Sequence, residues 1–409
     1  MTDAALNAGA PTAGPLRNVA PASLPSAAPV AAVGDAAEDA TSTPLRWTFT
    51  ASGDEYFRIW IVNLLLTVLT LGVYSAWAKV RREKYFYHHC LLDGTGFDYH
   101  GRPGSILRGR LLALVLLGLT QADFLGSVAT VGGSVVLLAI LPWLMQRSLR
   151  FRLSNTSYRG LRLAFDGDVA EAYRIVGGFA LMGCALVAAP ALALVGDAGR
   201  LVVLMVPLAV LLLYPMLHAS WRRYAIDHTR FGTLALSTRF RAREFLAVYV
   251  AVIALWFLMA LPAVVLVAAV ERLGEWAMAR GFDTRLSGQG STVLAGFIAY
   301  GMASSIWPYI TARVQNLTWQ GARIGPYALH SELDTMAFVR LQLTNLLLTV
   351  VTLGLYRPFA AVATARARID ALSLQADGAF RKTLASVQPI EGDAVGAEAM
   401  DLIGLDISL

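Results

Sequence analysis

One segment restricts the possible folds of this chain more than any other. Residues 245–270 read FLAVYVAVIALWFLMALPAVVLVAAV, without a single charged side chain. A helix of about 20 apolar residues crosses the hydrocarbon core of a bilayer, so this run is long enough. Charged residues make up 15% of the chain, whereas soluble domains average about 25%. We therefore expect a membrane protein, and further long apolar runs lie at 106–147, 172–196 and 200–219.

The basic residues indicate how the apolar runs are oriented. The 34 Lys and Arg are concentrated in polar segments beside these runs, whereas the short connections at 121–127 and 197–200 hold at most one. Basic residues near helix ends mark the cytoplasmic side of a membrane. We therefore interpret the net charge of +6 as an orientation signal. The expected partners are the lipid bilayer and anionic phospholipids rather than nucleic acid, and the sequence identifies no protein partner.

Short motifs recur along the chain and predict an internal repeat. NTSYRGLR at 155–162 and NLTWQGAR at 316–323 share Asn, a hydroxyl residue, an aromatic residue, Gly and Arg at the same spacing. Alternating apolar residues beside the Gly, as in LRLAF at 161–165, are typical of half-buried strands in hairpins. We predict about five units, each with a strand, a membrane segment, a basic exit helix and a second strand, and we place the short β-hairpins in the cytoplasm.

The two end units repeat one apolar string. Residues 63–74 read NLLLTVLTLGVY and residues 345–356 read NLLLTVVTLGLY. The middle units enclose two spans each, but each end unit encloses a single apolar segment. That segment is either a re-entrant hairpin on the cytoplasmic side or a plain spanning helix of about 22 residues. We favour the hairpin, with its bend at Gly72 and at Gly354, because Gly tolerates the bend.

The same two strings carry a polar stripe. Asn63, Thr67 and Thr70 are spaced so that they share one face of a helix, and the second string repeats the pattern. One interpretation is a polar lining for a solute or ion, as broken helices supply in transporters. The interpretation that we favour is hydrogen bonding between packed helices, worth roughly 0.6–2 kcal/mol per bond. The stripe comprises Asn63, Thr67, Thr70, Tyr74, Asn345, Thr349, Thr352 and Tyr356.

Rows of arginine border several apolar runs and are candidates for binding lipid head groups. Each contact with an anionic head group is worth about 1 kcal/mol. The alternative is that these arginines bind no lipid and only reflect the excess of positive charge on the cytoplasmic side of membrane proteins. The candidates are Arg147, Arg150, Arg152, Arg222, Arg223, Arg239, Arg241 and Arg243.

Other reactive residue types do not form a recognisable site. The segment 88–100, HHCLLDGTGFDYH, holds metal-ligand residue types, but its spacing matches no standard zinc pattern. We interpret it as a hairpin that turns at Asp93-Gly94. Cys90 and Cys184 lie in unlike contexts, so we expect no disulfide framework. We expect no metal and no cofactor, and enzymatic activity is the least supported class of function.

Two long motifs resemble a known family. GDEYFRIWIVNLLLTVLTLGVYSAWAKVRREKYFYHHCLLDG followed by FDYHG, and LRFRLSNTSYRGLRLAFDG with EAYRI, resemble the YjgN-like family of bacterial inner-membrane proteins. The resemblance covers roughly residues 46–380. It implies a polytopic inner-membrane protein whose biochemical role is uncharacterised, and it supplies no catalytic residues. The last unit departs from the pattern, because YRPFAAVATARARID lacks the aromatic residues and lysines of WAKVRREKY.

Together these patterns predict an all-α polytopic membrane protein with about six full spans and two terminal re-entrant hairpins or spans, eight membrane segments in all. We divide the chain into a disordered Ala/Pro-rich tail (1–44), a membrane domain (45–382) and a C-terminal tail (383–409). We expect it in the bacterial inner membrane as a scaffold or an anionic-lipid-interacting protein. The alternative is a transporter or channel that uses the strings at 63–74 and 345–356.

Overall fold

The computed structural model describes residues 44–120, 127–192, 196–281 and 286–376, together with Phe380 and Thr383. The tail predicted at 1–44 lies outside the described residues except for its last position. The tail predicted at 383–409 lies outside them except for Thr383.

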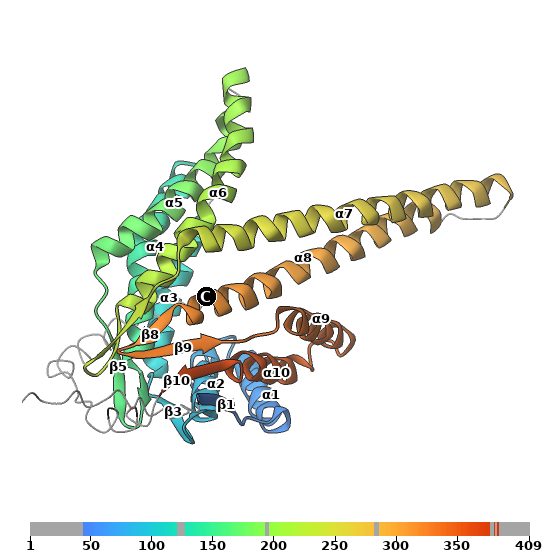
Figure 1. The fold of residues 1–409 in the computed structure, drawn as a ribbon. Helices are drawn as coiled ribbons and strands as arrows, with labels where there is room; N and C mark the ends of the chain where they lie inside the picture. The colour runs from blue at the N-terminus through green and yellow to red at the C-terminus, as the bar shows by residue number, and fades with distance from the viewer. Residues whose placement is uncertain are drawn as a thin grey trace, which may run out of the picture. The chain divides into compact units, whose positions relative to one another are not determined.

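In the described part of the chain, short strands form a closed antiparallel barrel of ten strands. Several of these strands are labelled in Figure 1. Each strand pairs with its neighbours in chain order, and the last strand pairs with the first through Leu45 and Leu374. A sheet that closes in this way leaves no edge strand with unpaired backbone groups. The strands are β1 (Leu45–Phe49), β2 (Cys90–Leu92), β3 (Thr95–Tyr99), β4 (Thr156–Tyr158), β5 (Leu161–Phe165), β6 (Thr229–Phe231), β7 (Leu234–Thr238), β8 (Ala322–Ile324), β9 (Tyr327–Ser331) and β10 (Leu372–Gln375).

A pair of helices lies between each odd-numbered strand and the next even-numbered strand. The described residues between Leu45 and Gln375 therefore form five strand–helix–helix–strand units joined by tight turns. In each unit the second helix, which leads into the even-numbered strand, is called the exit helix below. The helices are α1 (Gly53–Leu69), α2 (Ser75–His88), α3 (Pro103–Thr120), α4 (Ser127–Ser154), α5 (Val169–Leu192), α6 (Asp197–Asp227), α7 (Ala242–Ala279), α8 (Leu286–Gln320), α9 (Thr335–Val351) and α10 (Arg357–Ile369).

One backbone hydrogen bond recurs in all five units, at the end of the barrel from which the helices leave. In each case the residue after the odd-numbered strand donates its N–H to the carbonyl of a residue just before the even-numbered strand. This repetition shows that the units share one local geometry although few of their residues are identical. The bonds are Thr50 to His89 (3.0 Å), His100 to Asn155 (2.8 Å), Asp166 to His228 (3.0 Å), Arg239 to Gly321 (2.8 Å) and Glu332 to Ala371 (3.0 Å).

The opposite end of the barrel carries the tight turns between units. Asp93 and Gly94 have φ of +51° and +72°, and Arg159 and Gly160 have φ of +50° and +79°. Two consecutive residues with positive φ are what a two-residue hairpin turn needs to match the twist of its strands. The sequence motifs with Gly between alternating apolar residues are these turns.

The barrel interior is filled by side chains. Trp47, Tyr158, Tyr327 and Leu374 belong to one buried cluster, and the side chain of Leu374 is completely buried. Phe380 packs edge-on against Tyr327 with the ring centroids 4.8 Å apart. Small barrels are packed in this way by alternating inward-facing residues, so the interior is a core and not a pore.

The prediction of an all-α fold with eight membrane segments is wrong. The hairpins join into the barrel described above, and among the described residues α7 alone is long and apolar enough to count as a candidate span. α9 is apolar but only 17 residues long. The spans expected near 106–147 and 172–196 include residues that the structure does not describe.

Each of the two end units contains two helices joined by a turn, and not one continuous helix. α1 ends at Leu69 and α2 begins at Ser75, and α9 and α10 are separated in the same way. Gly72 and Gly354 both have φ of +93°. Leu71 and Leu353, one residue before them, have side chains that are 95% and 94% exposed. A plain spanning helix of about 22 residues is therefore excluded in both units.

Candidate functional site

Three of the exit helices, α6, α8 and α10, are held to the neighbouring unit by hydrogen bonds from corresponding positions. A side chain of the exit helix donates to the carbonyl of the second residue after the next odd-numbered strand. The last of these bonds joins the fifth unit to the first and so closes the ring of helices as well as the ring of strands. The bonds are Arg223 Nη2 to Phe240 O (2.6 Å), Asn316 Nδ2 to Leu333 O (2.9 Å) and Arg366 Nη2 to Ala51 O (2.6 Å).

The structure places the arginines predicted to bind lipid in several different settings. Arg223 is used in the bond to Phe240, and its guanidinium also lies 5.6 Å from the centre of the Phe240 ring. Arg147 lies 5.6 Å from the centre of the Trp143 ring, and its Nε is buried without a hydrogen-bond partner. Arg150 is half-buried. The exposed members of the set are Arg152, Arg222, Arg223, Arg239, Arg241 and Arg243.

Three of these exposed arginines stand where β7 leads into α7. Arg239 and Arg241 lie between the strand and the helix, and Arg243 is in the first turn of α7. Glu244 caps the helix by accepting a bond from the backbone N–H of Arg241 at 3.1 Å. The three arginines therefore lie in sequence at the barrel end of α7.

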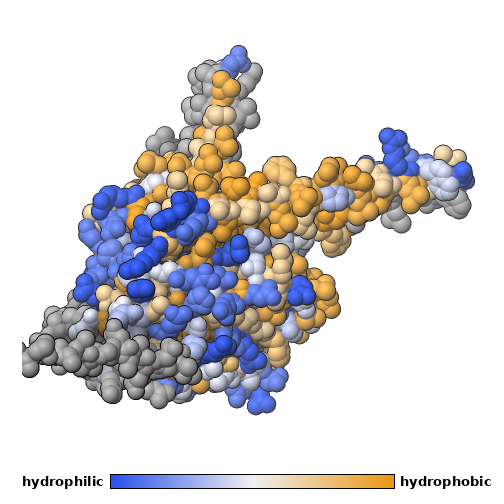
Figure 2. Space-filling model, in the orientation of Figure 1, coloured by the Kyte–Doolittle hydropathy of each residue, from blue (hydrophilic) through white to orange (hydrophobic). Residues whose placement is uncertain are grey.

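Beyond this basic end, α7 presents an apolar surface to its surroundings. Phe257, Leu258 and Leu261 are 64%, 71% and 70% exposed. Figure 2 shows hydrophobic residues along the length of α7 and polar residues at its far end. There the guanidinium of Arg280 lies 3.8 Å from the centre of the Trp276 ring. An aromatic and cationic pair of this kind is typical of a membrane boundary.

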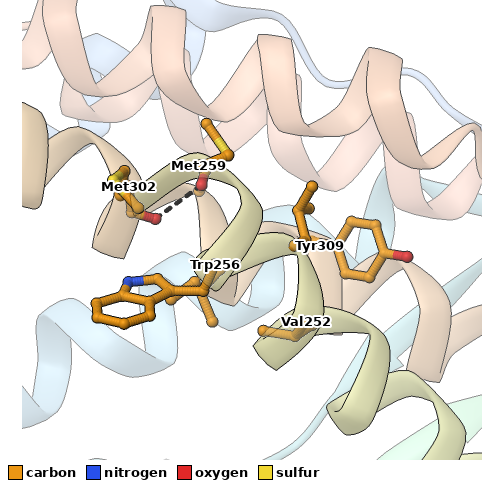
Figure 3. A pocket seen from close by; sticks show the side chains of 8 residues that line it. Val252, Trp256, Met259, Met302 and Tyr309 are labelled. Atoms are coloured by element: carbon orange, nitrogen blue, oxygen red, sulfur yellow. Dashed lines mark hydrogen bonds between the residues drawn. The ribbon is translucent and has the colours of Figure 1, made fainter. Parts of the chain in front are cut away.

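α7 and α8 lie side by side and enclose a shallow pocket (Figures 1 and 3). Most of the side chains around this pocket are large and apolar. The hydroxyl of Ser305 donates to the carbonyl of Met302 at 2.7 Å, so its hydrogen is not available to a ligand. The lining residues are Val252, Leu255, Trp256, Met259, Met302, Ser305, Ile306 and Tyr309.

In the first end unit, hydroxyls of the polar stripe bond to the backbone of their own helix. Thr67 donates to the carbonyl of Asn63 at 2.6 Å, and Thr70 donates to the carbonyl of Leu66 at 2.8 Å. Thr70 Oγ1 also accepts from the N–H of Tyr74 at 2.9 Å. Asn63 is buried, and its Oδ1 has no hydrogen-bond partner.

The second end unit repeats this arrangement. Thr349 donates to the carbonyl of Asn345 at 2.6 Å, and Thr352 Oγ1 accepts from the N–H of Tyr356 at 3.0 Å. Asn345 Nδ2 lies 3.5 Å from Thr364 Oγ1 on α10. The threonine hydroxyls are thus occupied by backbone groups, and Asn345 reaches across to the neighbouring helix.

The histidines of the segment 88–100 have separate partners. His89 Nδ1 lies 2.7 Å from the carbonyl of Tyr85, and His100 Nε2 lies 2.8 Å from the hydroxyl of Ser157. His88 faces Asp98 at 3.9 Å on the exposed surface. Within the described ranges, no three His, Cys, Asp or Glu side chains come close enough together to hold a metal. Cys90 and Cys184 are both free thiols.

Two buried glutamines were not identified from the sequence. Gln146 Nε2 donates to the carbonyl of Gly167 at 3.0 Å, across the junction between the second and third units. Gln315 bonds to Arg368 of α10 in both directions. The signal that could have found them is their place on the exit helices, since a polar residue deep in such a helix needs a partner in the next unit.

The architecture defines a class of protein: five strand–helix–helix–strand units around a closed barrel, with an apolar helix whose basic end lies at the barrel. The chain belongs to a family of bacterial proteins of unknown function, DUF898, whose family model matches residues 44–402. This confirms the family resemblance found in the sequence, which includes distant, partial homology to the inner membrane protein YjgN.

Relatives with a recorded name are matched over part of their length. The inner membrane protein YjgN of Salmonella typhimurium LT2 is 32% identical over 129 residues, which is 31% of this chain and 32% of that protein. The inner membrane protein YjgN of Escherichia coli K12 is 29% identical over 126 residues, or 29% and 31% of the two chains. The match therefore spans about a third of the relatives' length. No solved structure matches the chain.

Proposed function

We propose that this protein is a multi-pass inner-membrane protein in which α7 and α8 cross the bilayer as a hairpin and the basic end of α7 binds anionic phospholipids. Its role is that of a membrane scaffold built on the barrel. The observation that carries the proposal is the surface of α7, which is apolar and exposed along its length and begins at Arg239, Arg241 and Arg243. The names of the relatives agree with an inner-membrane location.

The free energy of burying apolar side chains favours lipid over water around α7. Leaving Leu258 and Leu261 in water is unfavourable, because burying a leucine side chain is worth about 1.5–3 kcal/mol. At about 1.5 Å per residue, the 38 residues of α7 are longer than the hydrocarbon core requires. The polar ends, with the arginines at one end and Trp276 and Arg280 at the other, can therefore reach the two head-group regions.

Lipid binding is tested by purifying the protein in a neutral detergent and measuring the anionic phospholipid that remains bound. We expect the triple substitution Arg239→Gln, Arg241→Gln and Arg243→Gln to reduce the retained anionic lipid several-fold, at about 1 kcal/mol per lost contact. The matched control makes the same charge change on barrel strands, at Arg46, Arg162 and Arg323. Equal lipid retention by the two triple variants would count against the proposal.

Insertion of α7 is tested separately by cell fractionation. The double substitution Leu258→Asp and Leu261→Asp places two carboxylates in the apolar part of α7, and each costs about 3 kcal/mol at the centre of a membrane helix. We expect the variant to leave the membrane fraction or to be degraded. Arg272→Asp and Met278→Asp, near the far end of the same helix, serve as the control and should leave the protein in the membrane.

The structure does not favour the transporter alternative. A transport site needs polar groups that are free to hold a solute, whereas Thr67, Thr70, Thr349 and Thr352 donate their hydroxyl hydrogens to backbone carbonyls. Asn63 Oδ1 is an exception, since it is buried without a hydrogen-bond partner. The polar stripe fits better with hydrogen bonding within and between helices.

A further inference from the structure

Each end unit carries a turn whose most exposed residue is a leucine. The segments 70–74 and 352–356, called the end turns below, join α1 to α2 and α9 to α10. Leu71 and Leu353 are 95% and 94% exposed, and their φ angles of +50° and +51° lie in the left-handed region. This backbone conformation is unfavourable for a residue with a bulky side chain. A residue type that suits neither water nor this conformation therefore stands at the same place in both units.

The apolar surface of the end turns continues onto the helices that precede them. In the first unit Leu65, Val68 and Leu69 are 57%, 65% and 77% exposed. An exposed apolar patch of this kind marks a contact with another protein or with a membrane. The corresponding residues of the fifth unit are exposed to a similar degree, at Leu347 (62%), Val350 (60%) and Val351 (69%).

The backbone N–H groups of the end turns are bonded within the turns themselves. In the first end turn, every N–H group from residue 70 to residue 75 donates to a nearby carbonyl or to the hydroxyl of Thr70. The bonds of Leu71 and Gly72 measure 3.1 and 2.7 Å. The N–H groups of residues 352–357 are bonded in the same pattern. Such a turn leaves no N–H group without a partner when water is removed from around it, so it is suited to an apolar environment.

Aromatic residues follow each end turn. The rings of Tyr74 and Trp77 stack 6.2 Å apart, and the rings of Tyr356 and Phe359 stack 5.6 Å apart. Tyr and Trp are enriched where a membrane meets water, because their rings are apolar at one end and polar at the other. The order of residues from each leucine toward the barrel is therefore that of a contact with lipid.

The exposed charge next to the end turns is mainly positive. Arg81, Arg82 and Lys84 are exposed on α2, where Glu83 is the single acidic residue. Arg357 is exposed at the first position of α10, and α10 contains no acidic residue. A second copy of the chain would bring a surface of like charge against this one, whereas anionic head groups would complement it. The charge therefore favours lipid over self-association.

We propose that the end turns rest on a lipid leaflet and insert the side chains of Leu71 and Leu353 into the outer part of its hydrocarbon region. The backbone of each turn stays at the head-group boundary, so this is a surface contact and not a membrane segment. The two end units are neighbours, because α1 and α10 lie side by side (Figure 1) and the rings of Phe57 and Phe359 stack 5.6 Å apart. The contact does not depend on the insertion of α7.

The contact is tested on the full chain with a nitrobenzoxadiazole fluorophore attached to a single cysteine. Cys90→Ser and Cys184→Ser remove the natural thiols, and Leu71→Cys or Leu353→Cys supplies the attachment site. The protein is reconstituted in vesicles of phosphatidylcholine and phosphatidylglycerol, with or without lipid that carries a nitroxide near the start of its acyl chain. We expect the nitroxide to quench either position about twofold more than the control Thr48→Cys, which is exposed on β1.

Iodide in the aqueous phase gives the complementary measurement. A fluorophore at position 71 or 353 should be protected from iodide, whereas a fluorophore at position 48 should be quenched by it. Protection from iodide without quenching by the lipid nitroxide would mean that protein covers the end turns, as in a complex of two copies, and would overturn the proposal. Equal quenching by iodide at all three positions would overturn it as well.

Because the fluorophore is itself apolar, a second set of variants separates its own affinity for lipid from that of the leucine. With the fluorophore at Val73→Cys, Leu71→Asn replaces the inserted side chain by a polar one that tolerates a positive φ. We expect quenching by the lipid nitroxide to fall about twofold, because the turn no longer inserts. Leu111→Asn, the same change at a 62% exposed position on α3, should leave the quenching unchanged.

Equal quenching in the Leu71→Asn and Leu111→Asn variants would show that the leucine makes no contact with lipid, and the proposal would fail. The fluorophores report only on the end turns. A negative result for Leu258→Asp and Leu261→Asp in the fractionation experiment would therefore leave the outcome at the end turns unaffected.

Discussion

The side chains that join neighbouring units lie at corresponding positions, with the same residue type at one position and different residue types at another. Asp227 Oδ1 accepts from the N–H of Thr238 at 2.6 Å, and Asp370 Oδ1 accepts from the N–H of Phe49 at 2.8 Å. Both carboxylates stand two residues before an even-numbered strand. At another corresponding position, Arg366 and Asn316 each donate a side-chain hydrogen bond to a backbone carbonyl of the neighbouring unit. The position in the unit is therefore retained while the residue type varies, and a comparison of residue identities along the chain does not reveal it.

The bond that closes the ring of helices can be removed by one substitution. Arg366→Met deletes the donor to Ala51 O and leaves that carbonyl without this partner. We expect the free energy of unfolding to fall by about 1 kcal/mol, the net worth of a typical hydrogen bond. The measurement is thermal or denaturant unfolding in detergent. Arg340→Met, an exposed change of the same charge on α9, should have a smaller effect, and equal effects would contradict a specific role for the bond.

The thiol of Cys90 gives a prediction about pH. Burial raises the pKa of Cys90 to about 12, and the carboxylate of Asp370 contributes to the increase. The reactive thiolate is therefore scarce at pH 8. In a Cys184→Ser background, the rate of reaction with a thiol reagent should stay low at pH 8 and still be rising at pH 10. A rate that reaches its plateau near pH 9 would show an unperturbed thiol.

The same shift predicts how Cys90 affects stability. Because the folded state favours the neutral thiol, its contribution to stability is present below the ordinary thiol pKa. It is lost as the pH rises through about 12. Replacing Cys90 by Ser should remove this alkaline dependence from the unfolding midpoint.

At the scale of elements, the helix–turn–helix of the end units depends on a glycine in the left-handed region. Gly354 has φ of +93°, and open space surrounds the position of its missing side chain except for Arg357 at 4.0 Å. Gly354→Ala should therefore destabilise the protein by backbone strain and not by a clash, at about 1–2 kcal/mol. Gly104→Ala, in the helix α3 with no atom near the new methyl group, should be neutral or stabilising. Unfolding midpoints of the two variants measure the difference.

From the sequence, the presence of local helices and turns could be predicted more accurately than the residues at which the helices begin and end. The repeated string at 63–74 indicated apolar helix and a Gly-containing turn, and the structure places the end of α1, the turn and Gly72 within it. The basic residues from Ser75 onward form the basic exit helix that the repeat predicted, α2, but the sequence did not reveal that this helix packs against α3 and β3. Hydrophobic periodicity reports the environment of a helix, and it does not distinguish lipid from a packed neighbour.

At the scale of the whole molecule, the hairpins were predicted from LRLAF and similar stretches, but the barrel was not. Each hairpin is local, whereas the pairing of Leu45 with Leu374 joins the two ends of the domain. Strands of three to five residues carry too weak a signal to specify their partners in the sheet.

The closure of the barrel depends on its core. Leu374→Ala removes a fully buried side chain from the last strand, and we expect a loss of about 2–5 kcal/mol in the free energy of unfolding. Leu353→Ala makes the same chemical change at a position that is 94% exposed, and should cost far less. Denaturant unfolding followed by near-ultraviolet circular dichroism, which reports on packed aromatic residues such as Trp47 and Tyr158, measures both.

The pairing of β1 with β10 also sets an order of events during synthesis. The first strand leaves the ribosome long before its partner has been translated, so Leu45–Phe49 keeps one side without its hydrogen bonds while the helices emerge. Pairings between distant parts of a chain form slowly and expose incomplete sheets to aggregation. A nascent chain that ends before Leu372 lacks β10 and cannot close the barrel, even when its helices have already folded. A truncated chain therefore cannot form the closed barrel, because the last strand to be synthesised is the one that completes it.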